Sequence, residues 1–126
     1  MKILTVLAMA GAVALGSAAP ALADHHRPGA SLKITVAVEG LPVKHARLTC
    51  GRAGGSHPTP KAACKVLRSV RGNPARLTDP GTICTKEYRP HTVTVRGRWY
   101  GKRVDFTRTF GNGCLMTAEG RALYKL

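Results

Sequence analysis

The chain has 126 residues, with 20 Lys or Arg against 6 Asp or Glu, and a formal net charge of +14. This length indicates one domain and excludes a multidomain chain, and the 5% of aromatic residues allow only a small hydrophobic core. The charge favours polyanionic partners but says nothing about the fold.

Residues 1–23, "MKILTVLAMAGAVALGSAAPALA", are typical of a secretory signal peptide. Lys2 supplies a minimal positive region, residues 3–15 form an apolar run, and "ALA" at 21–23 is a small-x-small cleavage site. No later run is apolar enough to span a bilayer. We therefore expect a secreted, extracellular domain over residues 24–126, with no membrane segment.

Two strands are predicted at the start of this domain. Residues 31–38, "SLKITVAV", alternate between apolar and polar side chains, which is typical of a half-buried antiparallel strand. The stretch "EGLP" at 39–42 indicates a turn, and residues 43–50 are expected to return as the second strand.

An amphipathic helix is predicted after the Gly-rich loop at 51–58. Thr59 can cap it and Pro60 suits its first position. Apolar residues then follow at helical spacing until Gly72, which is expected to end the helix. In the preceding loop, His57 is expected to order the chain by hydrogen bonding.

The C-terminal half predicts more strand than helix. After an irregular stretch at 73–84, strands are expected at 91–97 and 102–110, joined around "RGRWYG". Residues 115–120 favour a short helical turn, and 121–126 a last short strand. Strands before and after one amphipathic helix predict an α+β domain, an antiparallel sheet with helix cover.

Four cysteines, Cys50, Cys64, Cys84 and Cys114, fit an exported protein in an oxidising setting. Four cysteines allow three disulfide connectivities, which spacing alone leaves open. Zinc binding is the alternative, but there is no Cys-x2-Cys or His-x3-His pair.

The residues expected of an enzyme are missing or dispersed. Ser31, Ser56 and Ser69 lie outside any Gly-x-Ser-x-Gly motif. The histidines and carboxylates are scattered, and no His-Glu-x-x-His motif occurs. We therefore predict that the protein is not an enzyme and carries no cofactor or metal.

Trp99 and Tyr100 lie in the predicted hairpin connection among four basic residues, Arg96, Arg98, Lys102 and Arg103. Basic residues interleaved with aromatic rings can bind single-stranded nucleic acid by stacking and phosphate contacts. We favour the alternative, a turn with the Trp packed on the sheet and solvated charges beside it, because one Trp-Tyr pair is a thin stacking platform.

Several motifs share one order along the chain. They are "LTCG" at 48–51, His57-Pro58, Ala63-Cys64, "CTKEYRP" at 84–90, "GRWYGKRV" at 97–104 and "FGNGCLM" at 110–116. In this the chain resembles the subtilisin inhibitor-like family, of the Streptomyces subtilisin inhibitor type. The resemblance covers nearly the whole of the expected mature chain.

The resemblance implies a five-stranded antiparallel sheet with one main helix and one short helix. It implies disulfides Cys50–Cys64 and Cys84–Cys114. Family members are secreted homodimers that inhibit serine proteases with an exposed, substrate-like loop, so serine proteases and a second copy of the chain are the implied partners.

The resemblance also assigns the reactive loop. The residue two positions after the third cysteine, here Lys86, fills the protease's primary pocket, so the reactive bond would be Lys86–Glu87. Its flanks would be Cys84, Thr85 and Tyr88, and Asn112 would support the loop from behind. A cation at this position indicates trypsin-like specificity, with inhibition of subtilisin also expected.

A second function is also compatible with the sequence. The excess of basic residues fits a secreted protein that binds polyanions, either nucleic acid or an anionic cell-wall polymer. Such binding would fall steeply with salt.

Overall fold

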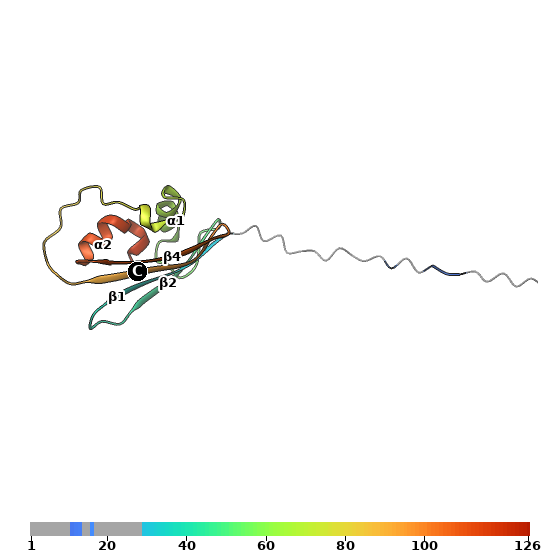
Figure 1. Ribbon diagram of the computed structural model, residues 1–126, viewed down its shortest axis with the longest axis horizontal. Helices are drawn as coiled ribbons and strands as arrows, with labels where there is room; N and C mark the ends of the chain where they lie inside the picture. The colour runs from blue at the N-terminus through green and yellow to red at the C-terminus, as the bar shows by residue number, and fades with distance from the viewer. Residues whose placement is uncertain (1–10, 14–15, 17–28) are drawn as a thin grey trace, which may run out of the picture.

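The computed structural model describes residues 11–13, 16 and 29–126 (Figure 1). The predicted signal peptide, apart from 11–13 and 16, lies outside the described residues, as do residues 24–28 of the predicted domain. Within the described part, no helix combines the length and apolar character that a membrane span requires.

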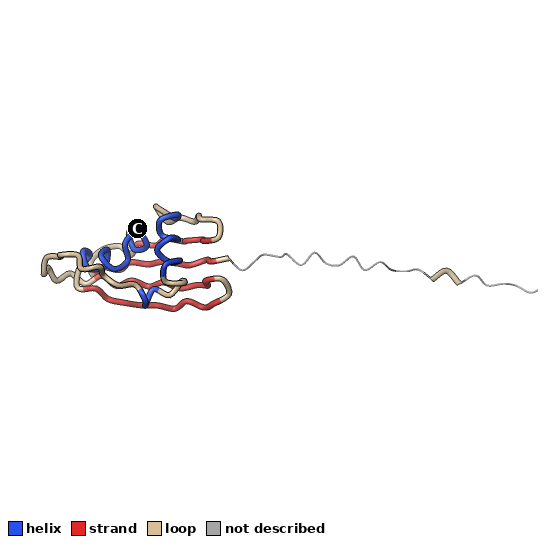
Figure 2. Tube along the Cα trace, turned by 90° about the horizontal axis from the view of Figure 1, so that it is seen from above, coloured by secondary structure: helices blue, strands red, loops and turns tan. Residues whose placement is uncertain are grey.

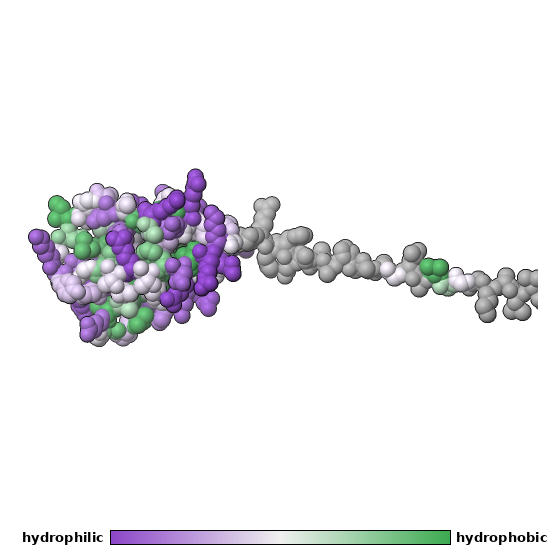
Figure 3. Space-filling view, viewed as in Figure 1, coloured by the Kyte–Doolittle hydropathy of each residue, from purple (hydrophilic) through white to green (hydrophobic). Residues whose placement is uncertain are grey.

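Four antiparallel strands form one sheet in the order β2-β1-β3-β4. The strands are β1 (Ala30–Val38), β2 (Lys44–Cys50), β3 (His91–Trp99) and β4 (Lys102–Phe110). Each lies within two residues of its predicted range, because the alternating side chains specify both the strand and its buried face. Hydrophilic side chains gather at the end of the domain where β1 begins (Figure 3).

The helices lie on one face of this sheet (Figures 1 and 2). They are α1 (Pro60–Ser69), α2 (Gly113–Gly120) and two short 3-10 helices, η1 (Pro74–Arg76) and η2 (Arg121–Tyr124). The α1 prediction is confirmed, with Pro60 in the first turn, although the Thr59 side chain makes no capping hydrogen bond. The domain is therefore α+β, in two layers.

The expectation of a fifth strand was wrong. The described residues form four strands, and the segment predicted as the last strand, 121–126, contains η2 instead. Leu123 and Tyr124 are both buried although they are adjacent, whereas a half-buried strand would bury one and expose the other. The carbonyl of Leu123 also bonds His57 Nε2 at 3.1 Å, which directs this segment toward the α1 side of the molecule.

His57 thus orders its loop as predicted. Its ring is 4% exposed, and its Nδ1 accepts a hydrogen bond from the backbone N–H of Thr59 at 3.0 Å. Together with the Leu123 contact, these bonds join the Gly-rich loop, the start of α1 and the C-terminal segment.

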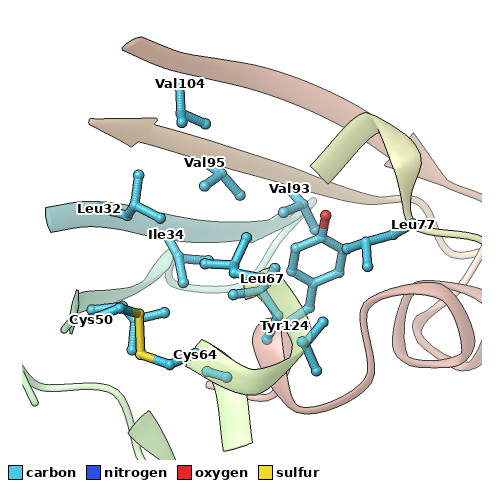
Figure 4. Packing of buried hydrophobic residues seen from close by; sticks show 14 of the residues in the cluster. Leu32, Ile34, Cys50, Cys64, Leu67, Leu77, Val93, Val95, Val104 and Tyr124 are labelled. Atoms are coloured by element: carbon cyan, nitrogen blue, oxygen red, sulfur yellow. A yellow bond between two sulfur atoms is a disulfide. The ribbon is translucent and has the colours of Figure 1, made fainter. Parts of the chain in front are cut away.

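The core lies between the sheet and the helices (Figure 4). Its largest fully buried side chains come from three strands, from α1 and from η2: Leu32, Ile34, Leu48, Val93, Val95, Leu67, Leu123 and Tyr124. A disulfide between Cys50 and Cys64 fastens β2 to α1 beside this cluster. In the loop-entropy model such a closure is worth about 3 kcal/mol, a large share of the stability of a small domain.

Trp99 is part of this core, as expected for a Trp packed on the sheet. The alternation of β3 turns Trp99 toward the helices, where it is 7% exposed, while Arg96 and Arg98 point to the opposite face. Tyr100 packs edge-on against Trp99 with ring centroids 5.0 Å apart. A buried Trp99 offers no face on which a base can stack, which confirms the alternative of a Trp packed on the sheet.

The contact between Gly72 and Trp99 gives a stability prediction. Gly72 has φ +76°, and a Cβ there would overlap the Trp99 ring. We expect Gly72→Ala to lower the free energy of unfolding by about 2–5 kcal/mol, from left-handed backbone strain and overpacking together. Chemical denaturation measures this loss.

Gly40→Ala is the matched control, because Gly40 has φ +79° but open space around its Cα. It should cost only about 1–2 kcal/mol, the backbone strain alone. Equal losses in the two variants would show that the Trp99 contact contributes nothing.

Candidate functional site

A long connection without helix or strand runs from Leu77 to Pro90 and passes the end of the sheet beside α2 (Figure 1, yellow to orange). Residues 85–89 are all exposed, and Ile83 and Tyr88 are 96% and 83% exposed. Large apolar side chains displayed this openly on an irregular segment are typical of a binding loop.

The connection starts with a side-chain turn. Asp79 Oδ1 accepts hydrogen bonds from the backbone N–H of Gly81 at 2.9 Å and of Thr82 at 2.8 Å. The bond from Thr82 is the main cause of the lowered pKa of Asp79, because it stabilises the ionised form. The sequence signal for this turn is Asp-Pro-Gly at 79–81, within the stretch expected to be irregular.

A disulfide fixes the middle of the connection. Cys84 pairs with Cys114, which lies in the first turn of α2, and their Cα atoms are 5.8 Å apart. All four cysteines lie in the described part of the chain and all are paired, so none is left as a thiolate for zinc. Among the described residues, no group of three or more His, Cys, Asp or Glu side chains could hold a metal ion.

The side chain of Asn112 holds the segment that follows Cys84. Asn112 is 4% exposed, and its Nδ2 donates to the carbonyl oxygens of Thr85 at 3.0 Å and Glu87 at 2.8 Å. Its Oδ1 accepts from the backbone N–H of Leu115 at 2.9 Å and so caps α2. One amide therefore links the start of α2 to the two carbonyls on either side of Lys86.

The far end of the connection joins the sheet. The backbone N–H of Arg89 donates to the carbonyl of Gly111 at 2.8 Å, and Pro90 then fixes the backbone before β3 begins at His91. No sequence signal pointed to the Arg89–Gly111 bond, because it joins two backbone groups that come together only in the folded sheet.

Lys86 lies between these attachments and its side chain is exposed. The peptide bond between Lys86 and Glu87 is held on one side through Thr85 and Cys84 and on the other through Glu87 and Arg89. Such an arrangement can present a short peptide segment to a partner in one conformation, at little ordering cost on binding.

A buried carboxylate lies at the other end of α2. Glu119 is 6% exposed, and its Oε1 lies 2.8 Å from Arg108 Nη1. Burial raises the pKa of Glu119 despite the opposing charge of Arg108, and Asp79 raises it further. Burial likewise raises the pKa of the nearby Tyr124, with a smaller contribution from Glu119.

Two Asn-to-Ala variants test the loop support. Asn112→Ala removes both loop hydrogen bonds and the cap, so we expect the free energy of unfolding to fall by about 1–3 kcal/mol. We also expect the backbone order parameters of residues 85–87 to drop from about 0.85 to below about 0.6, as measured by NMR relaxation.

Asn73→Ala is the matched control, because Asn73 also caps a helix, through a bond from the backbone N–H of Ala75. It should cost about 1 kcal/mol and leave the loop rigid. An unchanged loop in Asn112→Ala would contradict the assigned support.

Glu119→Gln tests the buried carboxylate. A folded-state pKa above the unfolded value makes stability fall as the pH rises through the folded pKa. The unfolding free energy of Glu119→Gln minus that of the wild type should therefore grow as the pH rises above 4.5, the ordinary pKa of this carboxyl. Urea titrations across this range measure the difference, and a decrease with pH would mean that the Arg108 ion pair dominates.

Comparison with known proteins shows which family this chain resembles. Residues 28–112 match the model of the family described as subtilisin inhibitor-like. A subtilase-type protease inhibitor of Streptomyces coelicolor is 38% identical over 131 residues, covering 96% of this chain and 90% of that protein. Trypsin inhibitor STI2 of Streptomyces longisporus is 40% identical with the same coverage.

A solved structure has the same fold. Streptomyces caespitosus sermetstatin, in complex with Bacillus licheniformis subtilisin, aligns with a TM-score of 0.62 and 33% identity. The alignment covers 78% of this chain and 99% of that one. The family consists of protease inhibitors and not of enzymes. From the match over residues 28–112 and from these relatives, the chain belongs to the subtilisin inhibitor-like family.

Proposed function

We propose that the chain is a secreted inhibitor of serine endopeptidases whose reactive bond is Lys86–Glu87. The observation that carries this proposal is the pair of hydrogen bonds from Asn112 to the carbonyls of Thr85 and Glu87, directly on either side of Lys86. They hold the exposed bond in one conformation, as a substrate-like inhibitor requires. The solved complex of the relative sermetstatin with subtilisin supports a serine protease as partner.

Both ends of the proposed reactive bond are attached to the same support. When the protease serine attacks the Lys86 carbonyl carbon, the leaving amine is that of Glu87. Glu87 stays bound to Asn112 through its carbonyl, and Arg89 stays bound to Gly111. The amine therefore remains near the acyl group. Because a held, oriented amine has a high effective concentration there, religation of the peptide bond competes with hydrolysis of the acyl group.

Lys86 sets the proposed specificity. Trypsin-like proteases carry an Asp at the base of the primary pocket and take a cation there. The name of the relative trypsin inhibitor STI2 agrees with a trypsin-like target. The sermetstatin complex supports inhibition of subtilisin as a second activity. Ile83 and Tyr88, which are exposed beside Lys86, would add apolar contact area to either complex.

Secretion and dimerisation complete the proposal. Residues 1–23 have the pattern of a signal peptide, and both disulfides fit an oxidising compartment. The proposal of a homodimer rests on the family resemblance. Sedimentation equilibrium of the oxidised protein measures the molar mass that tests it.

Lys86→Ala tests the specificity. Removing one partner of a buried ion pair costs about 2–5 kcal/mol, so we expect the inhibition constant for trypsin to rise at least roughly 30-fold. Titration of active trypsin with increasing inhibitor measures it. Lys86→Arg should retain tight inhibition, because Arg also fills a cationic pocket.

Lys61→Ala is the control for loss of charge, since Lys61 is exposed on α1, outside the loop. It should leave trypsin inhibition unchanged. Tight inhibition by Lys86→Ala, with both disulfides intact, would show that another residue fills the protease pocket.

A further inference from the structure

A groove lies between the segment that follows α1 and the outer strand of the sheet, β4. Its volume is about 430 Å³, within the range of roughly 300–1,000 Å³ that is typical of ligand sites. Figure 4 shows Val104 on this outermost strand, next to Val95 of β3. The apolar residues that line the groove are Val70, Pro74, Trp99, Val104 and Phe106. The proposed reactive loop lines none of it.

The backbone of β4 is unpaired along this groove. β4 is an edge strand, and both residues of the two-residue turn before it have positive φ, 45° and 84°. Such a turn makes Trp99 and Lys102 a hydrogen-bonded pair. Alternation along β4 then directs the backbone N–H and C=O groups of Arg103, Asp105 and Thr107 away from β3. Among the described residues, none of these groups has a backbone partner in the loops or helices, so the edge is open to an added strand.

Three basic side chains line the same groove. Arg71 and Arg76 come from the segment after α1, and Lys102 comes from the start of β4. All three are exposed, and strand alternation places Lys102 on the helix side of β4. Among the described residues that line the groove, Asp105 is the one acid, and it bonds Arg96 at 3.2 Å. The rim of the groove is therefore positive.

Arg71 occupies a backbone conformation that suits a different residue. Its φ is +53°, in the left-handed region that glycine adopts without strain and that strains any other L residue. An arginine held at a strained position beside a groove points to a use of its side chain. Because glycine fits this conformation, a substitution here can separate binding from stability.

The charges decide between the occupants that this edge can take. β4 carries three basic residues and one acid, so a second copy pairing β4 with β4 would place like charges together, which is destabilising. An extended peptide with acidic side chains neutralises the rim instead. Every second side chain of such a strand faces the groove. An apolar residue between two acidic ones, at alternate positions, then meets both the apolar floor and the positive rim.

We propose that the groove and the β4 edge bind an extended acidic peptide segment, which adds to the sheet antiparallel to β4, the more stable pairing. Backbone hydrogen bonds to Arg103, Asp105 and Thr107 set its register, and the three groove cations select its carboxylates. This site lies at the turn end of β4, whereas the Arg89–Gly111 bond that holds the reactive loop follows the other end. One molecule can therefore hold the peptide and a protease together, and the site does not depend on protease inhibition.

The test uses the disulfide-oxidised protein purified after expression of the full chain. The probe is a peptide with both ends blocked, Ser-Glu-Thr-Val-Thr-Glu-Ser, in which the two Glu and the Val occupy alternate positions. Trp99 is the one Trp of the chain and lines the groove, so its fluorescence reports the affinity. Binding should shift the backbone amide resonances of residues 102–107. No shift there at about 1 mM peptide would overturn the proposal.

Two altered peptides separate backbone pairing from charge. In the antiparallel arrangement the two Thr of the peptide direct their N–H groups to β4, so N-methylation of both should weaken binding about tenfold or more. The peptide with Gln in place of both Glu should bind roughly tenfold more weakly, and its affinity should lose its dependence on salt. Unchanged affinity of the N-methylated peptide would exclude strand addition, and unchanged affinity of the Gln peptide would exclude the role of the cations.

Two matched double variants remove equal charge from the protein. Arg76→Gln with Lys102→Gln should weaken peptide binding about tenfold, since an exposed ion pair contributes up to about fivefold. Lys61→Gln with Lys65→Gln, on the exposed side of α1, should change the affinity less than about threefold. Equal losses in both would overturn the proposal in favour of diffuse attraction.

Arg71→Gly separates binding from stability. It removes a groove cation and relieves the left-handed backbone, so the melting temperature should stay the same or rise while peptide affinity falls about threefold. Unchanged affinity would contradict the place of Arg71 in the site.

Two further measurements identify the occupant of the edge. Saturating peptide should leave both the molar mass of the protein assembly and the end point of the trypsin titration unchanged. A fall in molar mass to that of a smaller assembly would assign the β4 edge to a second copy of the chain. Loss of trypsin inhibition would overturn the separate placement of the groove and the reactive loop.

Discussion

The side-chain amide of Asn112 is the interaction on which the proposed activity depends. It is buried, and all three of its hydrogen bonds serve the same junction: one caps α2 and two hold the carbonyls of Thr85 and Glu87. Only an amide supplies a donor group and an acceptor in this geometry. An Asp would keep the cap and repel the two carbonyls, so the residue type itself is required.

The rest of the domain holds this amide in position. The helix that Asn112 caps is fixed at its start by the Cys84–Cys114 disulfide and near its end by Glu119, paired with Arg108 of β4. The C-terminal segment after α2 packs Leu123 and Tyr124 into the core, and the carbonyl of Leu123 is hydrogen-bonded to His57. A small domain thus places one exposed bond on a support made of a sheet end, a short helix and the Cys84–Cys114 disulfide.

Most of the fold could be predicted from the sequence, because alternating side chains specify strands and buried faces without outside information. The last segment could not, since whether Leu123 and Tyr124 are buried together depends on the space left between α1 and the sheet. Trp99 was ambiguous for the same reason: its place in the alternation of β3 decides whether it packs or stacks. The roles of Lys86 and Asn112 came from the family motifs, since nothing in local spacing brings residues 85 and 112 together.

The most direct test of the reactive bond is to expose the oxidised protein to a trace of active trypsin for days and to map the cuts by mass spectrometry after reduction. The chain has 20 lysines and arginines, many of them exposed. We predict a single cut, after Lys86, that stops at a mixture of intact and cut chains, because the held ends religate. Cleavage at several basic residues, or complete cleavage after Lys86, would contradict the proposal that this bond is held for inhibition.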